Sequence, residues 1–151
     1  MPFDRELVEA LLALDRILSS DWPKLALDAL EAGADGPGIR RLAAFDSPTY
    51  FEVRDILPRA IKEMALAEIT PGVAALRIAK KHAKEILRRG DDPLKHVHDF
   101  QDLWFESGEI SELNDLNTMD DEINVGFAGQ SDDEIRAWII ERLKKFVANG
   151  A

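Results

Sequence analysis

The stretch that most constrains the fold is residues 71–90, PGVAALRIAKKHAKEILRRG, because it has the pattern of one long amphipathic helix. At about 100° per residue, its apolar side chains fall on one arc, which other parts of the chain must cover. Thr70 is suited to the N-cap, Pro71 to the first helical position and Gly90 to a left-handed end. The sequence therefore predicts a helix whose two ends are both set locally.

A stripe of basic side chains follows the flank of this predicted helix. We call it the basic stripe, and its members are spaced by four, three and four residues: Arg77, Lys81, Lys84 and Arg88. Such a stripe can dock an acidic partner, or it can face solvent and pair with carboxylates of the same chain. We expect the second arrangement, because acidic residues are plentiful nearby in the sequence.

The charge of the chain is distributed unevenly. Residues 1–90 hold 14 acidic and 14 basic side chains, residues 91–134 hold 14 acidic side chains and only Lys95 as a base, and residues 135–151 hold four bases and one acid. The net charge of −10 thus arises in residues 91–134, which we call the acidic segment. A segment of this sign repels phosphate backbones and attracts basic surfaces, so we expect a basic protein and not a nucleic acid as partner.

Length and composition indicate one domain. A chain of 151 residues that is 46% apolar can bury a core without disulfides or a metal. It has no cysteine, which excludes thiol catalysis and thiolate metal sites. No apolar run approaches the roughly 20 residues of a membrane span, and the start is acidic, so we expect a cytoplasmic protein with no membrane partner.

Helical periodicity recurs along most of the chain. The further stretches that show it are residues 4–19, 20–33, 39–45, 47–64, 92–108 and 131–149. Pro58 interrupts the fourth of them, so we expect a kink or two abutting helices near residues 56–57. Ser131 and Glu134 match a capping box at the start of the last one.

Residues 109–130 have the weakest pattern. One or two helical turns are expected first, and then an irregular segment held by the apolar side chains of Ile123, Val125 and Phe127. These three alternate as in a strand, but no other part of the chain resembles a partner strand. The predicted architecture is therefore all-α: an irregular bundle of six or seven helices, one domain over residues 1–151, and no significant sheet.

The histidines and carboxylates do not form a recognisable catalytic motif. His96 and His98 are two residues apart on a predicted helix and point about 160° away from each other, so they cannot hold one metal together, although His82 on the preceding helix could approach one of them. The acidic runs at residues 120–123 and 132–135 lack the pattern of a calcium loop. Nucleophile elbows and phosphate loops are also missing. We expect no catalytic residue, no metal site and no cofactor.

One stretch resembles other proteins. Residues 52–60, EVRDILPRA, preceded by residues 41–43 and followed by a turn at residues 69–72, resemble small all-helical bacterial proteins of uncharacterised function. The resemblance covers the middle third of the chain and, more loosely, the acidic segment before the last helix, and it implies no activity. In size and charge the chain is also similar to immunity proteins that neutralise toxins.

These observations favour a non-catalytic module that binds a basic partner protein, in a regulatory or toxin-neutralising role. The residues expected at its docking surface combine acids with aromatic anchors: Trp104, Phe105, Glu106, Asp120, Asp121, Glu122 and Phe127. Three alternatives stay open. The first is a divalent-metal-dependent enzyme that uses the clustered carboxylates, the second is a self-associating structural protein, and the third is an acidic surface that is only solvated and binds no partner.

Overall fold

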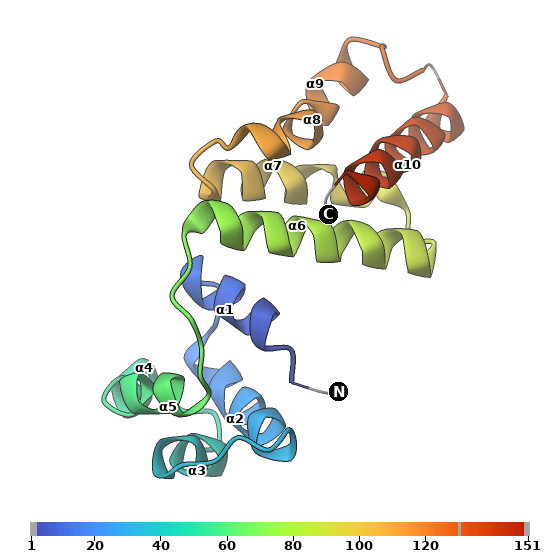
Figure 1. Cartoon of the computed structure of the whole chain (residues 1–151). Coiled ribbons are helices and arrows are strands. Elements are labelled where there is room, and N and C mark those ends of the chain that lie inside the picture. The colour runs from blue at the N-terminus through green and yellow to red at the C-terminus, as the bar shows by residue number, and fades with distance from the viewer. Residues whose placement is uncertain (1–2, 130, 150–151) are drawn as a thin grey trace. The chain divides into compact units, whose positions relative to one another are not determined.

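The computed structural model describes residues 3–129 and 131–149, and within them every regular element is a helix (Figure 1). This confirms the all-α prediction. The helical segments, α1 to α10, outnumber the six or seven expected. The chain divides into two compact units, unit 1 (Met1–Ile69) and unit 2 (Thr70–Ala151), which are described separately; that they make one domain stays a prediction.

Unit 1 is built from short helices around one apolar cluster. Its elements are α1 (Arg5–Ala13), the 3-10 turn η1 (Ser19–Asp21), α2 (Trp22–Glu31), α3 (Pro37–Ala44), α4 (Tyr50–Val53) and α5 (Leu57–Glu63). Trp22 is the largest residue of the cluster and is 2% exposed. The rest of the buried cluster comes from α2 to α5 and the residues that flank them: Ala26, Ala29, Ile39, Leu42, Val53, Ile56, Ala60 and Met64.

The first helix is shorter than predicted. Asp4 accepts a hydrogen bond from the Leu7 amide as expected of an N-cap, but α1 ends at Ala13 and not at residue 19. Asp15 adopts a left-handed conformation with φ 55°, and the Arg16 amide donates to the Leu11 carbonyl at 2.8 Å, which closes the helix end. Leu18, which falls within the predicted helical range, is therefore outside α1 and 68% exposed.

The break at Pro58 is confirmed. Helices α4 and α5 are separated by residues 54–56, and Pro58 lies in the first turn of α5. A proline is tolerated there because the amide it lacks would have no partner within the helix. One predicted stretch thus becomes two helices, which accounts for part of the excess over six or seven.

A carboxylate from α5 caps α3. The Ile39 amide donates to Oε1 of Glu63 at 3.0 Å, while Gly36 at the N-cap of α3 has no side chain to offer. Two glycines make room for this contact: a Cβ at Gly36 would lie 2.2 Å from the Glu63 carboxyl carbon, and one at Gly38 would lie 3.0 Å from the Ala60 amide nitrogen. Helix α3 therefore starts, and packs against α5, at a point set by a residue 24 positions away.

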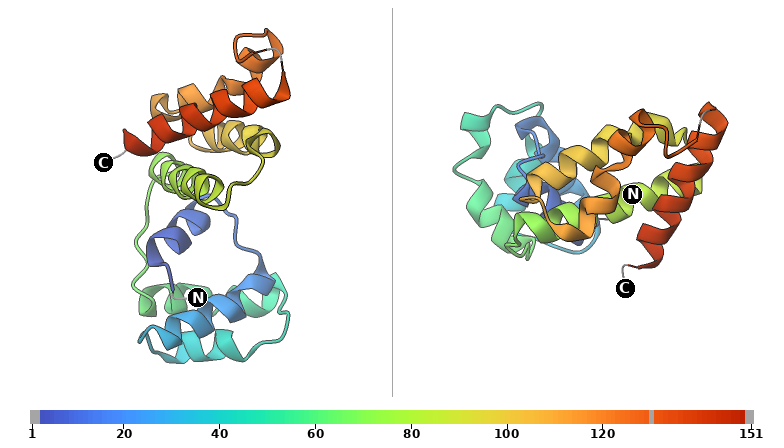
Figure 2. Two further views of the ribbon diagram at one scale, coloured as in Figure 1. Left: turned by 90° about the vertical axis from the view of Figure 1, so that its right-hand side faces the viewer. Right: turned by 90° about the horizontal axis from the view of Figure 1, so that it is seen from above.

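Unit 2 is organised around the long helix predicted at residues 71–90. Its elements are α6 (Pro71–Arg89), η2 (Pro93–His96), α7 (Val97–Glu106), η3 (Ser111–Leu113), α8 (Asn114–Asn117), α9 (Met119–Asn124) and α10 (Asp132–Ala148). Helix α6 packs against both α7 and α10 (Figure 2). Its predicted ends are confirmed: Thr70 Oγ1 accepts from the Val73 amide at 3.2 Å, and Gly90 is left-handed with φ 69°.

The ends of α7 and α10 also follow the sequence signals. Asp92 caps η2, which leads into α7, and Ser107 follows the last residue of α7. At α10 the capping box is confirmed, since Ser131 Oγ accepts from the Glu134 amide at 3.1 Å and the Glu134 carboxylate accepts from the Ser131 amide at 3.3 Å. No helix in the described ranges is both long and apolar enough to cross a membrane.

The prediction for residues 109–130 is wrong in two respects. The segment contains η3, α8 and α9, so it is more helical than expected. Val125 and Phe127 do not hold it in place, because they are 65% and 79% exposed. The side chains that anchor it are Leu113, Leu116 and Met119, which are all fully buried. Their spacing of three residues follows a helix, whereas the alternation at residues 123–127 misleadingly resembled a strand.

An ion pair joins the start of η2 to α10. The Arg136 guanidinium donates from Nε to Asp92 Oδ1 at 3.0 Å and from Nη2 to Oδ2 at 3.4 Å. Asp92 Oδ1 also accepts from the Leu94 amide at 3.1 Å. The hydrogen bond from Arg136, together with that of the Leu94 amide, holds the pKa of Asp92 below its ordinary value of 3.8.

We expect Asp92→Asn to lower the melting temperature at pH 7, with a difference from the wild type that shrinks as the pH falls. Asparagine can keep the cap but not the charge. A carboxyl whose pKa is lower in the folded state adds stability above its unfolded pKa and loses it as the pH falls through the folded value. Melting curves between pH 7 and about pH 3 measure the difference. Asp102→Asn, an exposed carboxylate of α7, is the control; an equal effect of both variants would contradict the role of the pair.

Candidate functional site

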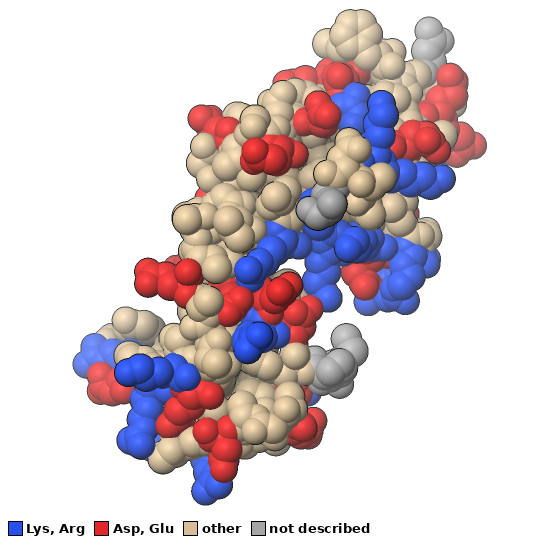
Figure 3. Space-filling model, in the orientation of Figure 1, with Lys and Arg blue, Asp and Glu red and all other residues tan. Residues whose placement is uncertain are grey.

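Charged side chains separate by sign within unit 2. Acidic side chains spread over α7 to α9 and the start of α10, whereas basic side chains gather over α6 and α10 (Figure 3). Three carboxylates of the acidic segment, Asp92, Glu122 and Asp133, pair with arginines of α10. Most carboxylates of the acidic segment are exposed to solvent.

Two of the predicted anchors lie in the last turns of α7. The rings of Trp104 and Phe105 meet edge to face, with centroids 5.1 Å apart. Phe105 is 62% exposed, and the neighbouring Trp104 is half-buried. Glu106 follows directly and is exposed. This end of α7 thus carries an exposed aromatic side chain next to an exposed carboxylate; that it docks a partner stays a prediction.

The other predicted residues lie on α9 and in the turn after it. Asp120 Oδ1 is 3.8 Å from Nε2 of His98, which lies on α7 two helical turns before Phe105 and on the same side. Asp121 is exposed. Glu122, in contrast, pairs with Arg142 of α10 at 2.9 Å. The structure therefore brings Asp120 alongside the α7 face of Phe105 but directs Glu122 to another helix.

Phe127 is the most exposed large apolar residue described, at 79%. It follows α9 in a turn where Gly126 has a φ of 84°, and the Phe127 amide donates to the Glu122 carbonyl at 2.9 Å. The hydrogen-bonded turn leaves the Phe127 side chain exposed to solvent. Phe127 is therefore a second exposed aromatic residue of the acidic segment, in addition to Phe105.

The basic stripe lies on α6, and one of its members pairs within that helix. Arg88 pairs with Glu85 of its own helix at 2.7 Å, and that hydrogen bond holds the pKa of Glu85 below its usual value. Arg77, Lys81 and Lys84 lie on the same helix, and Arg77 lines a groove described next. From α10, Arg136 and Arg142 pair with carboxylates of the acidic segment.

A groove of about 620 Å³ opens between α6, η3, α8 and α10. Lys80 lies over the Phe146 ring, 5.1 Å from its centroid. Four basic side chains and two acidic ones line the groove together with apolar residues: Arg77, Lys80, Arg142, Lys145, Glu112, Asp115, Val73, Leu76, Phe146 and Asn149. Because basic side chains outnumber acidic ones in its lining, the groove suits an anionic group. It is not part of the predicted docking surface, which is acidic.

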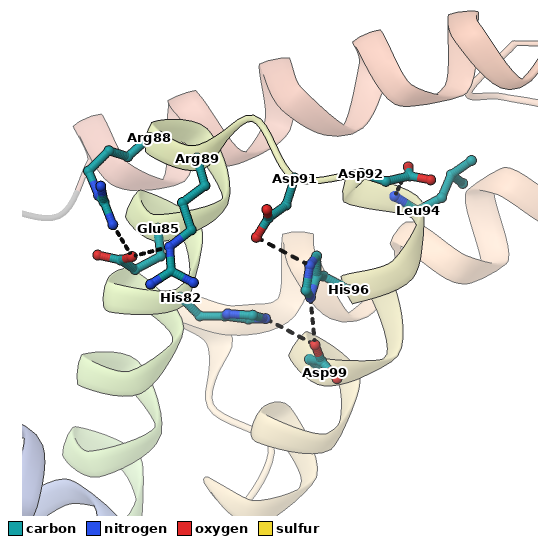
Figure 4. Close-up of polar contacts among 9 residues, drawn as sticks. All are labelled: His82, Glu85, Arg88, Arg89, Asp91, Asp92, Leu94, His96 and Asp99. Atoms are coloured by element: carbon teal, nitrogen blue, oxygen red, sulfur yellow. Dashed lines mark hydrogen bonds and ion pairs between the residues drawn. The ribbon is translucent and has the colours of Figure 1, made fainter.

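A compact cluster of His82, His96 and Asp99 lies where α6 meets the start of α7 (Figure 4). Oδ2 of Asp99 is 3.0 Å from Nε2 of His82 and 3.1 Å from Nδ1 of His96. The two imidazole rings meet edge to face with centroids 4.8 Å apart, and His82 also lies 5.2 Å from the ring of Phe100. Burial opposes ionisation of Asp99, but the hydrogen bonds from both histidines outweigh it and lower its pKa.

The sequence suggested this cluster only in part. His96 and His98 diverge as predicted, because His98 turns toward Gln101 and Asp120. His82 does approach His96, which the sequence allowed but did not favour. The missed signal is the spacing of His96 and Asp99, three residues apart and hence on one helix face.

Comparison of the chain with protein-family models, curated proteins and solved structures yields no match. The resemblance to small helical bacterial proteins therefore stays a prediction. The chemistry of the surfaces just described is the basis for proposing a function.

Proposed function

We propose that this chain is a non-catalytic protein-binding module that docks a basic partner protein on the acidic surface of α7 and α9, in a regulatory or toxin-neutralising role. The observation that carries the proposal is the exposure of Phe105, 62%, and Phe127, 79%, on a surface of carboxylates. Aromatic side chains are enriched in protein–protein interfaces relative to the rest of the protein surface.

The two kinds of residue would make different contributions. Carboxylates such as Asp102, Glu109 and Asp121 have no described ion pair in residues 3–129 and 131–149, so they are available to speed the approach of a basic surface. Aromatic side chains that enter pockets of a partner supply most of the binding energy. Phe105 is therefore expected to anchor the complex, with the acids around it selecting a partner of positive charge.

The test is affinity capture from lysate of the source cells at low and high salt, with captured proteins quantified by mass spectrometry. We expect a stoichiometric basic protein whose binding weakens with salt. Phe105→Ala should weaken the purified complex roughly 30-fold, the effect of losing an anchor worth about 2 kcal/mol. Asp102→Asn with Asp121→Asn should mainly slow association. Glu122 is left unchanged because it pairs with Arg142.

Phe51→Ala is the matched control, since Phe51 is also strongly exposed, at 72%, but lies on α4 in unit 1. It should bind the partner as the wild type does. If no basic protein is captured, or if Phe105→Ala and Phe51→Ala bind equally well, the proposed docking surface is wrong.

A further inference from the structure

We propose that His82, His96 and Asp99 form a binding site for a divalent transition-metal ion, zinc above all, through two imidazole nitrogens and one carboxylate oxygen. One ligand atom from each of the three residues lies within 4.8 Å of the other two. A tetrahedral zinc ion with bonds of about 2.0–2.1 Å holds its ligand atoms roughly 3.3 Å apart. Small rotations of the side chains therefore convert the present hydrogen-bonded arrangement into a coordinated one.

The second nitrogen of His96 supports this assignment. Nδ1 of His96 faces Asp99, and Nε2 lies on the opposite side of the ring, 3.9 Å from Oδ2 of Asp91 (Figure 4). Histidines that bind metals usually direct their other ring nitrogen to a carboxylate or carbonyl, which holds the proton away from the metal. Asp91 lies beyond hydrogen-bond distance in the present arrangement, but a small rotation of its side chain would let it accept the Nε2 proton when Nδ1 binds the ion.

The three proposed ligands are carried by two helices that pack against each other. His82 lies within the long helix α6, His96 is the N-cap of α7, and Asp99 lies in the first turn of α7. Contact of the His82 ring with buried Phe100 restricts the orientation of that ring. Ligands carried by two packed helices lose less conformational freedom on binding an ion than ligands on loops.

Access and charge also suit a cation. The side chains of His82 and His96 are 29% and 24% exposed and that of Asp99 is 50% exposed, so an ion can enter from solvent and keep a water molecule as a further ligand. Asp91 and Asp99 bring negative charge to the site. Two cations drawn in Figure 4, Arg88 and Arg89, pair with Glu85 at 2.7 and 3.0 Å, which offsets their repulsion of a metal ion.

The nitrogen ligands determine which ion is expected. Imidazole suits zinc and its neighbours among the transition metals, whereas magnesium and calcium require oxygen ligands. The site is distinct from the acidic docking surface, and it does not depend on the proposed function. It also differs from an enzyme site made of clustered carboxylates, because two of its three ligands are histidines.

The test is titration of the full chain, stripped of metal, with Zn²⁺ in a calorimeter, and with Co²⁺ followed by visible absorption. We expect one equivalent of zinc to bind, the melting temperature to rise, and bound cobalt to give the intense visible bands of a tetrahedral nitrogen and oxygen site. Replacing a ligand, as in His82→Gln or His96→Gln, should weaken zinc more than roughly 100-fold. Asp91→Asn should weaken it about 10-fold, as expected for a residue that orients a ligand.

His98→Gln is the matched control, because His98 is a histidine of the same helix that faces away from the cluster. It should bind zinc as the wild type does, and circular dichroism of the metal-free variants checks that each is folded. The proposal is overturned if the wild type binds no zinc, if His82→Gln binds it as tightly as the wild type, or if Mg²⁺ raises the melting temperature as much as Zn²⁺ does.

Discussion

Phe100→Ala is expected to lower the free energy of unfolding of unit 2 by about 3–5 kcal/mol, the range for removing a buried phenylalanine. Phe100 is 1% exposed and lies on α7, in the part of the core where α7 faces α6. Its ring also contacts the ring of His82. Alanine would leave a cavity that two packed helices cannot close without moving, so both the lost burial and the cavity contribute to the cost.

The measurement is denaturant unfolding followed by far-ultraviolet circular dichroism. Phe105→Ala supplies a matched control, since it removes the same ring from the same helix at a position that is 62% exposed. It should change the free energy of unfolding by no more than about 0.5 kcal/mol. A cost below about 1 kcal/mol for Phe100→Ala would contradict its place in the core. The pair of variants also separates folding from binding, because only Phe105 belongs to the proposed docking surface.

Features set by neighbouring residues could be predicted from the sequence. The cap of α6 by Thr70, its left-handed end at Gly90 and the capping box of α10 all involve residues at most four positions apart. The break before Pro58 follows from the geometry of proline itself. Each of these signals acts within one helical turn, so it holds wherever the helix lies in the fold.

Features set by distant residues could not be predicted in this way. Arg136 reaches Asp92 across 44 positions, and His82 reaches Asp99 across 17. Residue types and periodicity show which face of a helix is apolar. They do not show which other helix packs on that face, or which residues of the two helices lie opposite each other. The histidine cluster depends on the relative placement of α6 and α7, and for that reason its spacing in the sequence was only suggestive.

The same limit applies to Gly38, where we expect Gly38→Ala to destabilise unit 1 by about 1–3 kcal/mol, as overpacking does. Sequence reasoning gives the opposite sign, because alanine in place of a helical glycine normally stabilises by about 0.5–1 kcal/mol. In the folded chain an alanine Cβ would lie 3.0 Å from the amide nitrogen of Ala60 and 3.2 Å from its Cα. These are backbone atoms of α5, so α3 and α5 would have to move apart.

Separation of the two helices would also weaken the cap of α3, since the added Cβ would lie 2.9 Å from Oε1 of Glu63, the atom that accepts from the Ile39 amide. Gly72 provides a matched control, because Pro71 and Gly72 open α6 as Pro37 and Gly38 open α3. There the nearest atom to a new Cβ is Cγ2 of Ile110 at 3.2 Å, a side-chain methyl group of a residue that is only half-buried.

Gly72→Ala should therefore be close to neutral, because Ile110 can rotate, whereas the backbone of Ala60 cannot yield without moving α5. Thermal and denaturant unfolding of the two variants measure the difference. If Gly38→Ala proves more stable than the wild type, α3 and α5 do not approach as closely as described, and helix propensity alone governs the position. If instead it is destabilised while Gly72→Ala is not, the close approach of the two helices, and not the residue type, determines the sign.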